Sequence, residues 1–141
     1  LDKNLSVSNN ANIFNKRKNS HIVIFYNKAN TYKINKFKDP KIKLIKLDLN
    51  SKNKFNLKNV LKHIRNLGYS RVFVESGINL LFDFVKNNLV DDFKLFISSK
   101  KIGKNGRNNI KKNINIHLKK RKYIIEKINL FGDKLLTYRI K

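Results

Sequence analysis

The chain has 141 residues, of which 33 are lysine or arginine and 9 are aspartate or glutamate, so its formal net charge is +24 at pH 7. This length fits one domain, and about 40% hydrophobic residues are enough for a folded core, which excludes wholesale disorder. The absence of cysteine excludes disulfides and thiol chemistry, and the absence of a long apolar run or secretory signal favours a soluble cytoplasmic protein with no membrane partner.

The first part of the chain predicts two strands joined by polar segments. Residues 1–20 are polar and rich in asparagine, without periodicity. The β-branched and aromatic run 21–26 predicts a buried strand, and residues 27–39 follow it as a polar connection. Asp39 and Pro40 mark a boundary, because a residue that precedes proline disfavours helix. The apolar positions within 42–49 then predict a second strand.

The next segment has the pattern of an amphipathic helix. Asn56 is a suitable N-cap, and Gly68 provides a stop at the other end. His63 lies off the apolar stripe, so we expect its side chain to face solvent. The stripe itself consists of Leu57, Val60, Leu61, Ile64 and Leu67.

The second half of the chain predicts a strand, a helix, another strand and a hairpin. Residues 71–75 form a third predicted strand, which leads into an amphipathic helix over 80–89. Alternating Phe93, Leu95 and Ile97 predict a fourth strand, and residues 100–113 predict a loop. Residues 123–130 and 135–140 predict an antiparallel hairpin whose turn is formed by Gly132 and Asp133.

This order of elements predicts an α/β fold in one domain over residues 1–141. We expect a mainly parallel sheet flanked by helices, with the C-terminal hairpin as its antiparallel part. Because the chain starts with Leu1 and contains no methionine, we interpret it as part of a longer protein.

The most informative stretch for chemistry is the passage from the third predicted strand into its helix. An apolar strand ends in Glu75, and two small residues, Ser76 and Gly77, lead into the helix. In open α/β sheets ligands gather at the carboxyl ends of strands, and a helix N-terminus offers unpaired N–H groups to a phosphate. The alternative is purely structural, with Ser76 and Gly77 as a tight turn and Glu75 as a charge beside a helix N-terminus.

Three other groups of residues are weaker candidates. His21, His63 and His117 lie in different elements, so a metal or acid–base trio is less favoured than three unrelated histidines. Asp91 and Asp92 fit a turn at a helix end better than a cation site. The loop around Gly103 and Gly106 carries Lys100, Lys101, Lys104 and Arg107, and it fits a solvated loop better than a phosphate site.

The positive charge has two interpretations. A surplus of +24 attracts polyanions, which favours nucleic-acid binding. However, lysine, asparagine and isoleucine, which all have AT-rich codons, make up nearly half of the chain, and the lysines are spread along its whole length. No helix-turn-helix, zinc-finger or RNP-type pattern is present. The sequence therefore favours a solvated basic surface over a nucleic-acid partner.

The stretch 74–80, followed by 88–97 and 99–103, resembles the C-terminal reductase domain of the bifunctional riboflavin biosynthesis deaminase/reductase, the RibD family. That family runs Val-Glu-Gly/Ala-Gly-Pro, then a helix, then Gly-Leu-Val-Asp-Glu, then a strand that ends Ala-Pro-Lys-Leu-Leu-Gly. Ser76 and Ile78 depart from this pattern, and Lys3 stands where the family has a serine near the cofactor. The resemblance extends over nearly the whole chain, although only its middle third is distinctive.

The resemblance implies a dihydrofolate-reductase-like fold and NADPH-dependent reduction of 5-amino-6-(5-phosphoribosylamino)uracil to the ribityl compound. It implies that Glu75 contacts this phosphorylated substrate and that the enzyme is a homodimer, and from the residues themselves we assign no metal site. It also implies that the deaminase domain and the first part of the reductase domain are absent from this chain. The cofactor phosphates are expected at the residues Gly77, Ile78, Asn79, Leu80, Leu81, Phe82 and Asp83.

Two alternatives remain open at this point. One is a basic nucleic-acid-binding module, and the other is a different NADPH reductase of the same fold. No catalytic residue is assigned, because in such a reductase the cofactor carries the chemistry and the protein orients it.

Overall fold

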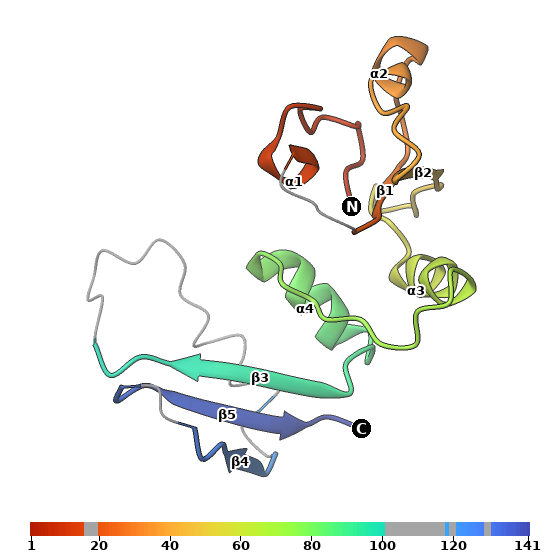
Figure 1. The fold of residues 1–141 in the computed structure, drawn as a ribbon. Coiled ribbons are helices and arrows are strands. Elements are labelled where there is room, and N and C mark those ends of the chain that lie inside the picture. Colours follow the sequence, from red (N-terminus) through yellow and green to blue (C-terminus); the bar gives the residue numbers. More distant parts are fainter. Residues whose placement is uncertain (16–19, 101–117, 119–120, 129–130) are drawn as a thin grey trace. The chain divides into compact units, whose positions relative to one another are not determined.

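The computed structural model describes residues 1–15, 20–100, 118, 121–128 and 131–141 (Figure 1). The chain divides into two compact units, residues 1–72 and residues 73–141, and each contains its own cluster of buried hydrophobic side chains. Both units combine helices with strands, so the predicted α/β class is confirmed. The expected mainly parallel sheet is corrected: the described strands form a two-stranded parallel sheet and a three-stranded antiparallel sheet, because β3 pairs with the returning strand β5 and not with β1 or β2.

The first unit is built on a pair of parallel strands. Its strands are β1, Ile22–Tyr26, and β2, Ile42–Lys46, and its helices are α1, Asn12–Asn15, α2, Thr31–Asn35, and α3, Leu57–Asn66. The two strands pair in parallel from Ile22 opposite Ile42 to Tyr26 opposite Lys46, which confirms both predicted strands. On the other side of β1, the amide of Asp2 donates to the Phe25 carbonyl at 2.9 Å.

The core of the first unit collects side chains from segments far apart in the sequence. Phe14 of α1 packs against Phe37, which follows α2, with ring centroids 5.5 Å apart. The buried members of this cluster are Leu5, Phe14, Ile24, Tyr26 and Phe37. Helix α2 corrects the prediction of a plain connection over residues 27–39: the Asn30 side chain accepts a hydrogen bond from the Lys33 amide at 2.9 Å and caps a helix too short to show apolar periodicity.

Helix α3 confirms the prediction made from its cap, stripe and stop. The Asn56 side chain accepts from the amides of Lys58 and Asn59, and Gly68 has φ +93° just after the helix. Leu57 and Val60 are buried. A left-handed conformation at this position suits glycine, because it has no Cβ to clash with the preceding turn.

We expect Asn56→Ala to lower the free energy of unfolding by about 1 kcal/mol, since two N–H groups of the first turn lose their acceptor. Urea denaturation followed by far-UV circular dichroism measures this. Asn59→Ala is the matched control: Asn59 is exposed within the same helix, and alanine there should leave stability equal or slightly higher. Equal midpoints for both variants would contradict the capping role.

His63 does not face open solvent as predicted. Its side chain is half-buried, and its ring lies edge-on to Phe25 of β1 with centroids 6.2 Å apart. The prediction failed because the ring of His63, just off the apolar stripe, still reaches Phe25 of β1.

The second unit is a helix packed on a three-stranded antiparallel sheet. Its elements are helix α4, Ile78–Lys86, and strands β3, Asp92–Ile97, β4, Tyr123–Ile125, and β5, Lys134–Arg139, in the sheet order β3-β5-β4. Leu81, Phe82 and Val85 of α4 pack against the buried cluster of Phe93, Leu118, Leu136 and Tyr138. The predicted second helix, fourth strand and antiparallel hairpin are therefore confirmed.

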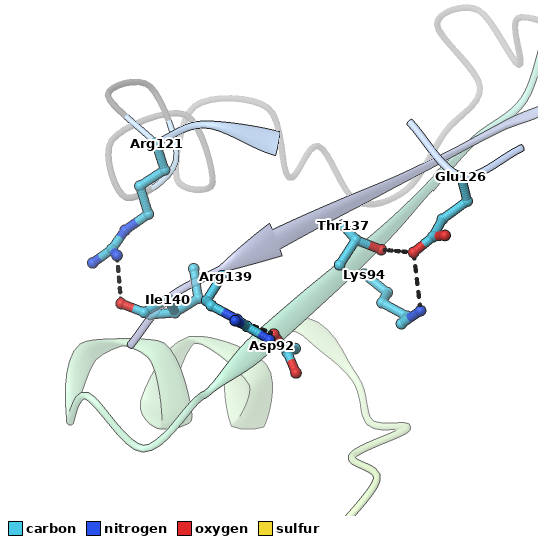
Figure 2. Close-up of polar contacts among 7 residues, drawn as sticks. All are labelled: Asp92, Lys94, Arg121, Glu126, Thr137, Arg139 and Ile140. Carbon is cyan, nitrogen blue, oxygen red and sulfur yellow. Dashed lines mark hydrogen bonds and ion pairs between the residues drawn. The ribbon is translucent and has the colours of Figure 1, made fainter. Parts of the chain in front are cut away.

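The other face of this sheet carries polar contacts beside the apolar side chains of Phe96 and Ile124 (Figure 2). Glu126 accepts hydrogen bonds from Thr137 at 2.7 Å and Lys94 at 3.4 Å, and Arg139 lies 3.7 Å from Asp92. The Thr137 hydroxyl and then the Lys94 ammonium hold the pKa of the Glu126 carboxyl below its usual range. These groups are solvated, so they link β3, β5 and the residue that follows β4 without forming an enclosed site.

Two predictions about the second half are corrected. Residues 71–77 contain no regular secondary structure, so the predicted third strand over 71–75 is wrong. Val72 and Phe73 are β-formers, but a strand also needs a neighbour to complete its hydrogen bonds, and none of the described residues pairs with this segment.

The hairpin turn falls one residue earlier than predicted, at Phe131 and Gly132, where φ is +52° and +96°.

Candidate functional site

The junction before α4 is open. Glu75, Ser76 and Gly77 are all exposed, and a Cβ built on Gly77 meets no atom within 4 Å. Gly77 has φ −63° and ψ 162°, an extended conformation that any residue can adopt. Glycine is therefore not required by the backbone at this position, and what it contributes is free space beside the first turn of the helix.

The first turn of α4 offers unpaired backbone donors. Gly77 is the N-cap and provides no side-chain acceptor, and no acidic residue lies in the first turn. The first intrahelical bond runs from the Leu81 amide to the Gly77 carbonyl at 3.2 Å, so the amides of Ile78, Asn79 and Leu80 precede it. These donors and the positive end of the helix dipole suit an anion.

The residues predicted to hold the cofactor phosphates divide into two groups. Gly77, Ile78, Asn79 and Leu80 form the open end of the helix. Leu81 and Phe82 belong to the second group, because their side chains pack against the core of the second unit. The Asp83 carbonyl accepts from the Asn87 amide and side chain near the other end of the helix. Only the first group therefore presents backbone donors to a ligand.

A cavity of about 470 Å³ lies in the first unit, where β1 and β2 end. We call it the β1–β2 cavity. Its polar lining comes from Asn4, Asn27, Lys28, Asn30, Lys33 and Lys46. None of these residues was predicted from the sequence; four of them, Asn27, Lys28, Asn30 and Lys33, lie in the segment 27–39, which was predicted to be a plain connection. Their signal was their place just after a strand, which is where ligands gather in open α/β sheets.

Asp2 orders the loop that supplies Asn4 to this cavity. Its carboxylate accepts from the amides of Ser6 and Val7, each at 2.7 Å, and from the Ser6 hydroxyl at 2.9 Å. Burial raises the pKa of the Asp2 carboxyl, but the bonds from Ser6 and Val7 outweigh it and hold that pKa below its usual range.

The lowered pKa of Asp2 makes part of the free energy of unfolding depend on pH. Since the folded-state pKa lies below the unfolded one, this contribution is complete above roughly pH 4 and is lost as the pH falls through the folded-state value. Asp2→Asn should lower the free energy of unfolding by about 1 kcal/mol at pH 7 and by less in acid. Thermal unfolding of both proteins between neutral and acidic pH checks this. A constant difference across that range would contradict the role of the ionised carboxylate.

The weaker candidates do not assemble into a site within the described part of the chain. No group of three or more histidine, aspartate, glutamate or cysteine side chains is placed to hold a metal there. Asp91 and Asp92 are in ion pairs with Lys141 and Arg139, at 3.5 Å and 3.7 Å. His117 and the glycine loop over 101–113 lie outside the described residues.

The described residues include no helix that is both long enough and apolar enough to span a membrane. A parallel β1–β2 pair followed by a helix-covered antiparallel sheet defines an α/β protein with an open helix N-terminus at Gly77 and a basic cavity at the ends of β1 and β2.

Comparison with known proteins identifies the family. Residues 1–130 match the family described as the RibD C-terminal domain. The riboflavin biosynthesis protein RibD of Aquifex aeolicus (strain VF5) is 29% identical over 137 residues, which cover 93% of this chain and 36% of that protein. The chain therefore spans about a third of the length of this relative.

The chain belongs to the RibD C-terminal domain family. Membership confirms the resemblance found in the sequence and, with it, the dihydrofolate-reductase-like α/β fold class.

Proposed function

We propose that this chain is a reductase domain of riboflavin biosynthesis, which uses NADPH to reduce 5-amino-6-(5-phosphoribosylamino)uracil to its ribityl counterpart. Family membership supports the pathway, and the similar protein of Aquifex aeolicus carries riboflavin biosynthesis in its name. The observation that carries the chemical part of the proposal is the open N-terminus of α4.

The residues of this junction fit a dinucleotide. The amides of Ile78, Asn79 and Leu80 point out of a helix end that has no capping side chain and no acidic residue. Gly77 leaves room for a phosphate to approach the backbone closely. Donors fixed by a helix need no reorganisation when the anion arrives. Bound NADPH would supply the hydride that reduces ribose C1′ and converts the ring to the open ribityl chain.

Glu75 is the residue proposed to contact the substrate. It lies two positions before Gly77 on the exposed segment that leads into α4. Its carboxylate can accept hydrogen bonds from hydroxyl or amino groups of the ribosylaminopyrimidine. In this proposal Glu75 orients the substrate, and it does not act as a nucleophile.

The test is an activity assay on the natural polypeptide that carries residues 1–141. Consumption of NADPH with 5-amino-6-(5-phosphoribosylamino)uracil, together with the ribityl product in mass spectrometry, would support the proposal. Turnover of another carbonyl compound in its place would assign the domain to a different reductase of the same fold. Absence of NADPH binding, combined with tight and steeply salt-dependent binding of duplex DNA, would favour a nucleic-acid module.

We also infer that the domain forms a homodimer through the second unit. Large apolar side chains are exposed along β3, β4 and the hairpin turn, and solvated apolar surface of this kind favours association. They are Phe96, Ile97, Ile124, Ile125 and Phe131, with exposed fractions from 42% to 94%. Light scattering coupled to size-exclusion chromatography measures the mass in solution, and a monomer at every concentration would contradict the inference.

A further inference from the structure

We propose that two copies of this chain meet through the face of the β3-β5-β4 sheet that lies away from α4, which we call the outer face. The proposal rests on the homodimer inferred above and adds which surface forms the contact. The outer face includes none of the residues that the proposed function places beside the cofactor or the substrate.

The register of the sheet assigns each side chain to one of its two faces. Residues directly opposite one another on paired strands share a face, and neighbours along a strand alternate between faces. Leu136 and Tyr138 belong to the cluster that α4 packs against, so they mark the face beneath the helix. The outer face is formed by the alternate positions, which are Asp92, Lys94, Phe96, Ile124, Leu135, Thr137 and Arg139, with Glu126 bonded to Thr137.

The outer face exposes large apolar side chains to water. Phe96 is 63% exposed and Ile124 is 70% exposed. Phe96 lies opposite Leu135, and Ile124 lies opposite Thr137, so all three strands contribute apolar groups to this face. Removal of such surface from water is the main driving force for association between protein surfaces.

The charges of the outer face suit a second copy of the same chain. The chain carries 33 basic and 9 acidic residues, so its net charge of +24 makes two copies repel each other over most of their surface. The charged side chains of the outer face are instead two acids and two bases, Asp92, Glu126, Lys94 and Arg139. Two such chains therefore approach with least repulsion when these neutral faces meet.

The same four side chains can also pair between copies. Glu126 lies 3.4 Å from Lys94, and Asp92 lies 3.7 Å from Arg139, with exposed fractions from 35% to 84% (Figure 2). A two-fold axis sets identical faces against each other, so the acids of one copy can reach the bases of its partner. A partner with charges of one sign, such as a nucleic acid, would leave two of the four without a match, which favours the second copy.

The experiment is sedimentation equilibrium of the chain over a range of concentrations, with a matched pair of variants. Ile124 and Ile125 are neighbours on β4, and they are 70% and 53% exposed, but the register sets them on opposite faces. We expect Ile124→Lys to raise the dimer dissociation constant at least about tenfold, because a two-fold contact buries the new ammonium twice. Ile125→Lys adds the same charge beside the face beneath α4 and should change this constant less than about threefold.

A charge swap tests the electrostatic part separately. Glu126→Lys makes the outer face basic, and it should weaken the dimer about tenfold, with a larger loss at low salt. Lys94→Glu/Glu126→Lys restores two acids and two bases, and it should recover most of that loss. Far-UV circular dichroism checks folding. If Ile124→Lys does not fold, Phe96→Lys and Ile97→Lys give the same comparison between faces on β3.

Four results would overturn the inference: a monomer at every concentration, equal weakening by Ile124→Lys and Ile125→Lys, weakening by Ile125→Lys alone, or no recovery in the double variant. NADPH binding is titrated in the same samples and does not enter the dimer constant. Its absence from a chain that dimerises through the outer face would remove the proposed function and leave this contact standing.

Discussion

Gly77→Val should weaken NADPH binding by roughly tenfold to a hundredfold while the domain remains folded. A valine side chain at this position fills the space beside the first turn of α4, where a Cβ on Gly77 meets no atom within 4 Å. The phosphate then loses hydrogen bonds from amides of the helix end, and bonds to a charged group contribute about 1.5–3 kcal/mol each. Calorimetric titration with NADPH measures the loss.

Two controls make this prediction sharp. Gly77 has φ −63°, so a β-branched residue adds no left-handed strain, and the thermal unfolding midpoint should change little. Ser70→Val places the same side chain at another exposed position on the irregular chain before α4, and it should leave NADPH affinity unchanged. Unchanged affinity in Gly77→Val itself would remove the helix end from the cofactor site and leave the proposed function without its structural support.

The sequence allowed reliable predictions where a local signal and a packing signal agreed. In α3, the Asn56 cap, the apolar stripe and Gly68 all indicate the same ten-residue helix, and the structure has it. The predicted strand over 71–75 rested only on its apolar, β-forming residues, and no cap or turn residue supported it. Val72 and Phe73 favour a strand wherever a partner strand exists, and a partner cannot be inferred from the composition of the segment itself.

The candidate site likewise has one part that the sequence predicted and one part that it did not. The small residues Ser76 and Gly77 before an amphipathic helix predicted an open helix end, and the described helix begins at Ile78, immediately after them. The β1–β2 cavity was not predictable in this way. It brings Lys28 and Lys46 together, although they are far apart in the sequence, and that meeting depends on the parallel register that sets Tyr26 opposite Lys46.

Phe93→Ala should lower the free energy of unfolding of the second unit by about 3–5 kcal/mol. Phe93 is 7% exposed, and its ring meets Tyr138 edge-on with centroids 6.4 Å apart. Tyr138 in turn packs on Tyr123 at 5.3 Å, so one row of aromatic rings joins all three strands of the sheet beneath α4. Removing the first ring leaves a cavity against α4 and deprives Tyr138 of a neighbour.

Phe96→Ala is the matched control for this loss, because Phe96 is on the same strand and is 63% exposed. It removes the same atoms but little buried area, and its cost should stay below about 1 kcal/mol. Native-state hydrogen exchange at Leu136 and Tyr138, which pair with β3, reports the second unit separately from the first. Protection that falls equally in both variants would mean that the sheet does not depend on the buried ring. Since total stabilities of domains are about 5–15 kcal/mol, the expected loss at Phe93 would unfold much of the second unit and take the α4 site with it.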